Sequence, residues 1–339
     1  MLPKQLTVCP LYFGRRKCIK LTMSEVRYRM NNIGFIFPGQ GSQKLGMLAE
    51  LAANFSVVEE TFAQASTILD QDLWQVSQTD HNEQLNQTDI TQPVLLAASV
   101  ALWRVWQDQQ GSQPSILAGH SLGEYSALVC SGVLAFSDAI QLVHQRGLYM
   151  QTAVSAGTGK MAAIVGLDDD KIAGLCEQAT QGQVVSAANF NSPGQTVIAG
   201  DVDAVERAMV LCKEAGAKRA LPLNVSVPSH CSLMKPAAEQ LQAELDRVQF
   251  NSPQIPIVQN VNAQISEDPN LIKENLIKQL YMPVLWVDSV KYMRANGVEK
   301  LLECGPGKVL SGLIRRIEPQ VSCFASDNPA SLENAIAEL

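Results

Sequence analysis

Residues 116–129 constrain the fold of this chain more than any other segment. A short apolar run, Ile116 to Ala118, leads into Gly119-His120-Ser121-Leu122-Gly123 and then into an apolar, helix-prone stretch. A serine framed by glycines at this point predicts a sharp turn from a strand into a helix, with the serine pointing out of the turn and the glycines giving it room. The N–H groups that begin the helix would favour an oxyanion beside it. An ordinary strand-to-helix loop with a capping serine is the alternative.

The composition is typical of a soluble globular enzyme. The chain has 339 residues, 46% of them hydrophobic and 17% charged, which is enough for a large core and a second, smaller unit. No apolar run is long enough to span a bilayer, so we expect no membrane contact. Eight scattered cysteines without a C-x-x-C pair, and only four histidines, predict a reduced cytoplasmic chain without a metal site.

The first thirty residues differ in charge from the rest of the chain. They hold seven basic residues and one acid, Glu25, a net charge of +6, so the remainder carries −13 of the total of −7. No apolar segment follows the basic residues, which argues against a secretory signal. We expect residues 1–30 to form a basic leader that is either disordered or not native to the protein, with a natural start at Met23 or Met30 in the second case. The acidic remainder argues against a nucleic-acid partner.

Hydrophobic patterning predicts a large α/β-hydrolase-like domain with a parallel-sheet core and an inserted ferredoxin-like subdomain. The pattern between about 159 and 223 is βαββαβ, and strand and helix patterns resume after it. We therefore assign residues 31–155 and 227–339 to the large domain and 156–226 to the small one. The elements predicted in the large domain are strands over 33–37, 116–118, 257–261 and 300–304, and helices over 44–69, 93–109, 137–151 and 290–295.

A serine hydroxyl needs a base within hydrogen-bond reach, and four histidines are available. His120 adjoins Ser121 but should point away from it across the turn. His81 lies in a polar loop, and His144 is expected on an exposed helix face. His230 follows the apolar segment that leaves the small subdomain, so it could overhang the strand ends where α/β sheets bind ligands. His230 is the candidate base, with a purely structural histidine as the alternative.

Arg146 is predicted on the apolar face of a helix that runs from a cap at Ser137 to about residue 151. The residues that share this face are Ala139, Leu142, Val143 and Met150. A guanidinium there is costly unless it meets an anion. An internal Asp or Glu is the usual partner, and a carboxylate on a substrate is the alternative. The second reading is plausible in space because this helix follows the one that begins after Ser121.

Six short motifs, in order from about residue 33 to the C-terminus, form a far more specific pattern. They are Phe37-Pro38-Gly39-Gln40-Gly41-Ser42-Gln43, Gly119-His120-Ser121-Leu122-Gly123-Glu124-Tyr125, Gln145-Arg146-Gly147, Asn189-Phe190-Asn191-Ser192-Pro193-Gly194-Gln195, Val227-Pro228-Ser229-His230 and Glu303-Cys304-Gly305-Pro306-Gly307. Together they resemble the bacterial malonyl-CoA:acyl carrier protein transacylases, the malonyltransferases of type II fatty acid synthesis. The basic leader lies outside this family pattern.

The resemblance implies a serine–histidine dyad that works in two steps. Ser121 would attack the thioester of malonyl-CoA, with His230 as general base and later general acid. The phosphopantetheine thiol of holo acyl carrier protein would then cleave the malonyl-serine ester. The backbone carbonyl of Gln279, rather than an aspartate, would orient His230.

The resemblance also implies how the substrate is held. The backbone N–H groups of Gln40 and Leu122 would bind the oxyanion, and Arg146 would bind the malonyl carboxylate. The implied enzyme is a cytoplasmic monomer that needs no cofactor, because the CoA thioester is its substrate. Since CoA and carrier proteins are anionic, local basic patches would have to receive them. The candidates are Lys213, Lys218, Arg219, Lys308, Arg315 and Arg316.

Three other functions stay open. An acyltransferase of the same fold could serve polyketide assembly or take another carboxylated acyl group, methylmalonyl included. A serine esterase on an α/β-hydrolase scaffold would need an aspartate that the sequence does not place, and it gives Arg146 no role. A catalytically inactive acyl-carrier-binding protein would not need both Ser121 and His230.

Overall fold

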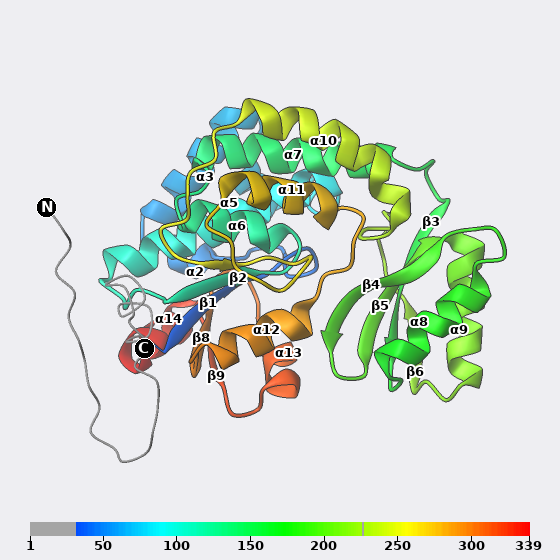
Figure 1. Ribbon diagram of the computed structural model, residues 1–339. Coiled ribbons are helices and arrows are strands. Elements are labelled where there is room, and N and C mark those ends of the chain that lie inside the picture. The colour runs from blue at the N-terminus through cyan, green and yellow to red at the C-terminus, as the bar shows by residue number, and fades with distance from the viewer. Residues whose placement is uncertain (1–31, 226) are drawn as a thin grey trace, which may run out of the picture.

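The computed structural model describes residues 32–225 and 227–339, so the predictions for residues 1–30 lie outside the described residues. A five-stranded parallel sheet and a four-stranded antiparallel sheet organise the chain (Figure 1). The parallel core and the small antiparallel sheet confirm the predicted α/β class. Within the described ranges, no helix has both the length and the apolar composition that a membrane crossing needs.

The large sheet has the strand order β7-β2-β1-β8-β9, and every neighbouring pair is parallel. Its strands are β1 (Ile33–Phe37), β2 (Ile116–Gly119), β7 (Ile257–Val258), β8 (Lys300–Glu303) and β9 (Ser322–Ala325). The chain adds β2 and β7 on one side of β1 and then β8 and β9 on the other. The loops after β1, β2 and β7 therefore meet at one edge, where open α/β sheets bind ligands.

Helices cover both faces of this sheet because its side chains alternate between two cores. Phe35 and Leu117 face a core formed mainly with α5, α6, α7 and α10, whereas Ile36 and Ala118 face α12 and α13 (Figure 1). The helices are α2 (Ala49–Ala52), α3 (Val57–Leu69), α4 (Leu73–Gln78), α5 (Thr88–Asp108), α6 (Leu122–Cys130), α7 (Phe136–Thr152), α10 (Lys235–Arg247), α11 (Pro269–Gln279), α12 (Trp286–Ala295), α13 (Val309–Ile317) and α14 (Pro329–Glu338), with a 3-10 turn η1 (Ser232–Met234) before α10.

The small sheet has the order β4-β5-β3-β6 with antiparallel neighbours throughout. Its elements are β3 (Gly159–Val165), α8 (Asp169–Ala179), β4 (Val185–Ser192), β5 (Gln195–Asp201), α9 (Val202–Glu214) and β6 (Arg219–Pro222). This is the βαββαβ order that the sequence predicts, with α8 and α9 packed together on the sheet. β4 reaches the large unit, because Val284 donates to the carbonyl of Ala188 at 2.9 Å. The boundaries at 155/156 and 226/227 stay predictions.

The helix predicted over 93–109 begins five residues earlier, at Thr88. Pro93 lies inside it and has no N–H to bond the carbonyl of Asp89. That carbonyl instead accepts a hydrogen bond from Nδ1 of His144 at 3.0 Å. His144 is therefore half-buried and hydrogen-bonded, which corrects the prediction of an exposed helix face.

Two further helix predictions are wrong at their starts or in their continuity. The region predicted as one helix over 44–69 is split into α2 and α3, because Asn54 donates to the carbonyl of Glu50 and ends the first helix. Ser137 does not cap α7. It lies within the first turn, and Ala135 occupies the N-cap without a side-chain hydrogen bond.

The glycines on both sides of Ser121 allow backbones to touch. A Cβ atom on Gly119 would lie 1.9 Å from the carbonyl carbon of Gly123, and one on Gly123 would lie 2.0 Å from the carbonyl oxygen of Phe37. The first turn of α6 therefore packs directly on β1 and β2. The glycines do more than leave room for the serine: they bring the helix N-terminus against the sheet.

We expect Gly123→Ala to lower the free energy of unfolding by about 1–3 kcal/mol, because backbone atoms cannot move away from the added methyl group. Equilibrium unfolding in urea measures the change. Gly174→Ala is the matched control, since a Cβ atom at this position of α8 meets nothing within 4 Å. It should raise stability by about 0.5–1 kcal/mol. Equal stability of the two variants would contradict this account of the turn.

Candidate active site

Ser121 is held in a strained backbone conformation at the turn from β2 into α6. Its φ of 52° and ψ of −107° are unusual for a residue other than glycine. Its N–H donates to Oδ1 of Asn260 at 2.7 Å, and its carbonyl accepts from Nε2 of Gln279 at 3.0 Å. Side chains thus fix the peptide groups on both sides of the serine, which is how such strain persists in a folded chain.

Asn260 is a site residue that the sequence analysis missed. Its Nδ2 donates to the carbonyl of Gly119 at 2.6 Å, so one amide bonds to backbone groups on both sides of His120. The strand predicted over 257–261 ends at Val258, because the chain then turns and brings Asn260 against the end of β2. A polar residue at the carboxyl end of an apolar strand was the available signal.

The structure brings His230 against Ser121, as the sequence predicted for the base. Nε2 lies 2.8 Å from Oγ of the serine, and Nδ1 lies 2.7 Å from the carbonyl oxygen of Gln279. A carbonyl can only accept, so Nδ1 carries the proton and Nε2 accepts from the hydroxyl. Gln279 is the last residue of α11, where helix carbonyls lack partners within the helix. The end of α11 thus sets the tautomer of the imidazole.

The electrostatic surroundings keep His230 neutral. Burial, and next the positive charge of Arg146, lower its pKa to about 3. Neutral imidazole is the form that can accept a proton from a serine hydroxyl.

Arg146 is buried and surrounded by neutral acceptors. Nη1 donates to Oε1 of Gln92 at 2.7 Å, and Nη2 donates to Oε1 of Gln279 at 3.0 Å and to Oγ of Ser121 at 3.2 Å. Nε has no hydrogen-bond partner within the described residues. No carboxylate of the described chain lies within ion-pairing distance of the guanidinium. The described residues therefore do not supply the internal Asp or Glu partner that is usual for a buried arginine.

Glu124 is a buried carboxyl group directly behind the dyad, and it was not assigned a role from the sequence. Its Oε2 accepts from Nε2 of Gln279 at 2.8 Å and from the backbone N–H of Asn260 at 3.2 Å. Burial raises its pKa to about 7, while these two hydrogen bonds and the charge of Arg146 act in the opposite direction. An acidic residue in the first turn of a largely apolar helix was the sequence signal.

The two backbone N–H groups predicted to bind an oxyanion lie at the same sheet edge. Leu122 begins α6, and Gln40 lies in the loop after β1. That loop touches the turn, because a Cβ atom on Gly39 would lie 2.4 Å from the carbonyl oxygen of His120. Within the described chain, neither N–H group has a hydrogen-bond partner. Both are free to bind an anion.

His120 points away from the serine hydroxyl, as predicted. Its Nε2 lies 2.8 Å from Oδ1 of Asn191 in β4, and its ring packs edge-on against Trp286 at 5.5 Å between centroids. His120 therefore connects the turn to the small sheet and is not the base for Ser121.

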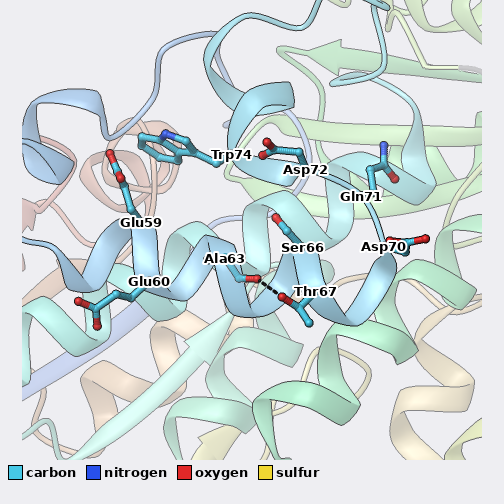
Figure 2. A pocket seen from close by; sticks show the side chains of 9 residues that line it. All are labelled: Glu59, Glu60, Ala63, Ser66, Thr67, Asp70, Gln71, Asp72 and Trp74. Carbon is cyan, nitrogen blue, oxygen red and sulfur yellow. Dashed lines mark hydrogen bonds between the residues drawn. The ribbon is translucent and has the colours of Figure 1, made fainter.

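A surface hollow of about 690 Å³ lies on α3 and α4 (Figure 2). Its lining includes four carboxyl groups and no basic residue, and within it Thr67 donates to the carbonyl of Ala63 along α3. None of the lining residues belongs to the site around Ser121. Because its carboxylates would repel an anionic ligand, the hollow is not a candidate for binding CoA.

Comparison with known proteins identifies the family. Residues 34–318 match the acyl transferase domain family. The chain belongs to this family and is an acyltransferase. Its similarity to the malonyl CoA-acyl carrier protein transacylase of Salmonella typhimurium is 58% identity over 309 residues, which cover 91% of this chain and 100% of that protein. The Escherichia coli K12 protein of the same name is 58% identical over 307 residues, covering 91% and 99%.

Solved structures of acyltransferases share the fold along nearly the same length. An acyl carrier protein S-malonyltransferase from Vibrio cholerae superposes with a TM-score of 0.88 at 60% identity, covering 90% of this chain and 99% of that one. A malonyl-transacylase solved in complex with a type II PKS acyl-carrier protein has a TM-score of 0.90 at 55% identity, covering 91% and 100%. The parallel core and the small sheet are thus those of this acyltransferase family.

We expect the imidazole of His230 to stay neutral, with its proton on Nδ1, from pH 8 down to pH 5. The reason is that its pKa of about 3 lies far below this range. Nitrogen-15 NMR of ring-labelled protein measures both the charge and the tautomer. A midpoint near 6.5 for His230 would contradict the electrostatic description of the site.

Proposed function

We propose that this acyltransferase moves a malonyl group from malonyl-CoA to the phosphopantetheine thiol of acyl carrier protein, and so supplies malonyl units for fatty acid synthesis. The observation that carries the proposal is the buried Arg146, which lies 3.2 Å from Oγ of Ser121 and lacks a carboxylate partner in the described chain. A carboxylated acyl group on the serine would supply that partner through two parallel hydrogen bonds. The names of the relatives support malonyl as the acyl group and a carrier protein as the acceptor.

In the first step, Oγ of Ser121 attacks the thioester carbonyl while Nε2 of His230 takes the hydroxyl proton. The N–H groups of Gln40 and Leu122 bind the oxygen that becomes negative. When the tetrahedral intermediate collapses, the carbon–sulfur bond breaks, and the CoA sulfur takes the proton from His230. The malonyl group remains as an ester on Ser121.

In the second step, the phosphopantetheine thiol gives its proton to His230 and attacks the ester. The intermediate again collapses, the bond to Oγ breaks, and the serine regains its proton. The thioester of the carrier protein is the product, so the cycle is ping-pong and uses no cofactor. Side-chain oxygens of Gln92, Gln279 and Ser121 accept from Arg146 and position the guanidinium beside the nucleophile.

The charge of Arg146 also links acyl selection to base strength. In the free enzyme this charge contributes to the low pKa of His230. A malonyl carboxylate bound to the guanidinium would neutralise the charge and make the imidazole a stronger base. An acetyl group would leave it unneutralised. Arg146 therefore favours malonyl-CoA over acetyl-CoA in two ways: it binds the acyl carboxylate, and once neutralised it leaves His230 a stronger base.

We propose that the carrier protein approaches the sheet edge that bears Ser121. We also propose that the enzyme is a monomer and works in the cytoplasm. Three of the predicted basic residues already have structural partners. Lys213 donates to the carbonyl of Ala217 just after α9, and Arg316 donates to Gln195 in β5. Lys308 donates to Ser331 and lies 4.0 Å from Asp327. Arg315, Lys218 and Arg219 remain candidates for contact. A polyketide carrier protein is the second candidate acceptor, because a structural relative is solved with one.

Intact-protein mass spectrometry after brief incubation with malonyl-CoA, acetyl-CoA or methylmalonyl-CoA tests the proposal. We expect a malonyl adduct on Ser121 that holo acyl carrier protein discharges, little acetyl adduct, and no adduct in Ser121→Ala, which lacks the nucleophile. An adduct of full yield in Ser121→Ala would contradict the assignment of the nucleophile. CoA release from the wild-type protein without an adduct would indicate a hydrolase.

A further inference from the structure

We propose that Glu124 is a positioning residue for acyl transfer: its carboxylate holds Gln279, and through Gln279 it fixes both Arg146 and His230. The role in selecting malonyl rests on the proposed function. Glu124 touches neither the serine hydroxyl nor the imidazole in the contacts described above. It is 1% exposed, lies one turn after Ser121 in α6, and faces the end of α11.

The side-chain amide of Gln279 is the link, and its orientation is determined. A guanidinium only donates, so Oε1 of Gln279 must face Arg146, at 3.0 Å. Nε2 then donates its two hydrogens to Oε2 of Glu124 at 2.8 Å and to the carbonyl of Ser121 at 3.0 Å. The carboxylate is thus one of two acceptors that keep this amide from rotating.

The main chain of the same residue orients the base. The carbonyl of Gln279 accepts from Nδ1 of His230 at 2.7 Å. A displacement of the whole residue at this helix end would therefore change the contact to Arg146 and the contact to His230 together. Gln279 therefore couples Arg146, which would bind the acyl carboxylate, to His230, which would take the proton. Glu124 holds Gln279 in place.

A second contact of the carboxylate reaches the strained turn. Oε2 of Glu124 accepts from the backbone N–H of Asn260 at 3.2 Å, and the Asn260 side chain bonds to the backbone of Ser121 and Gly119. One oxygen atom therefore joins α6, the end of α11 and the loop after β7. A carboxylate suits this position because it can accept from two donors at once.

The test compares acyl-enzyme formation from malonyl-CoA and from acetyl-CoA in Glu124→Ala and Glu124→Gln. In Glu124→Ala we expect kcat/KM to fall about 100-fold for malonyl-CoA and about 10-fold for acetyl-CoA, because misplaced groups cost about this much and acetyl does not use Arg146. In Glu124→Gln an amide oxygen can accept from the same two donors, so both values should stay within about 3-fold of wild type.

Two further variants separate positioning from folding. Glu303→Gln is the matched control: Glu303 is also a buried carboxyl group, but it accepts from the N–H groups of Leu310 and Ser311 at the start of α13. The Glu303→Gln variant should have the same ratio of kcat/KM for malonyl-CoA to kcat/KM for acetyl-CoA as the wild type. Gln279→Met retains the carbonyl that faces His230 and removes the amide. If Glu124 acts through this amide, the double variant with Glu124→Ala should be no more impaired than Gln279→Met alone.

A selective loss of malonyl transfer, rescue by Glu124→Gln and non-additivity with Gln279→Met support the proposal. Equal losses for both substrates, a Glu124→Gln variant as impaired as Glu124→Ala, or additive effects overturn it. If Glu124→Ala does not fold, the selectivities of Gln279→Met and Glu124→Gln decide: only the former should lose its preference for malonyl. A wild-type protein that forms no malonyl ester overturns the proposed function itself, whereas a malonyl-selective wild type with unchanged variants overturns only the role of Glu124.

Discussion

A buried positive charge that forms no ion pair with any carboxylate of the described chain is the constraint around which this site is organised. Burying a guanidinium is unfavourable unless its donors are satisfied and its charge is neutralised. Two glutamine oxygens and the serine hydroxyl satisfy donors of Arg146, but they carry no charge. Nε has no partner in the described chain, and the carboxyl group of Glu124 acts on the guanidinium only from beyond ion-pairing distance. The proposed substrate brings its own carboxylate to this point and would supply the missing partner.

The ends of secondary-structure elements supply the rest of the chemistry. β2 ends in a turn that exposes the strained Ser121, and α6 begins there with the N–H group of Leu122, which has no partner in the described chain. α11 ends at Gln279, whose carbonyl has no partner in the helix and instead orients His230. The proposed dyad needs no aspartate because this carbonyl already fixes the tautomer of His230. The buried Glu124 takes no part in that contact but holds the same residue from the other side.

Local pattern explains which parts of the fold could be predicted. The turn at Ser121, the βαββαβ order and the buried face that carries Arg146 follow from spacing within one or two elements. The partners of these groups do not. Asn260 meets Ser121 across 139 positions, and the proline in α5 is tolerated because a histidine 55 positions from Asp89 uses the carbonyl that it leaves free. Such contacts depend on tertiary packing, which no short window of sequence contains.

The most direct test of the central claim is a binding measurement on Ser121→Ala, which cannot react. Isothermal titration compares malonyl-CoA with acetyl-CoA in this variant and in the double variant with Arg146→Ala. We predict that malonyl-CoA binds at least about tenfold more tightly than acetyl-CoA, as expected of a charge-assisted bidentate contact, and that Arg146→Ala removes the difference. Equal affinities in the Ser121→Ala protein would show that the buried charge is structural and that the acyl carboxylate is recognised elsewhere.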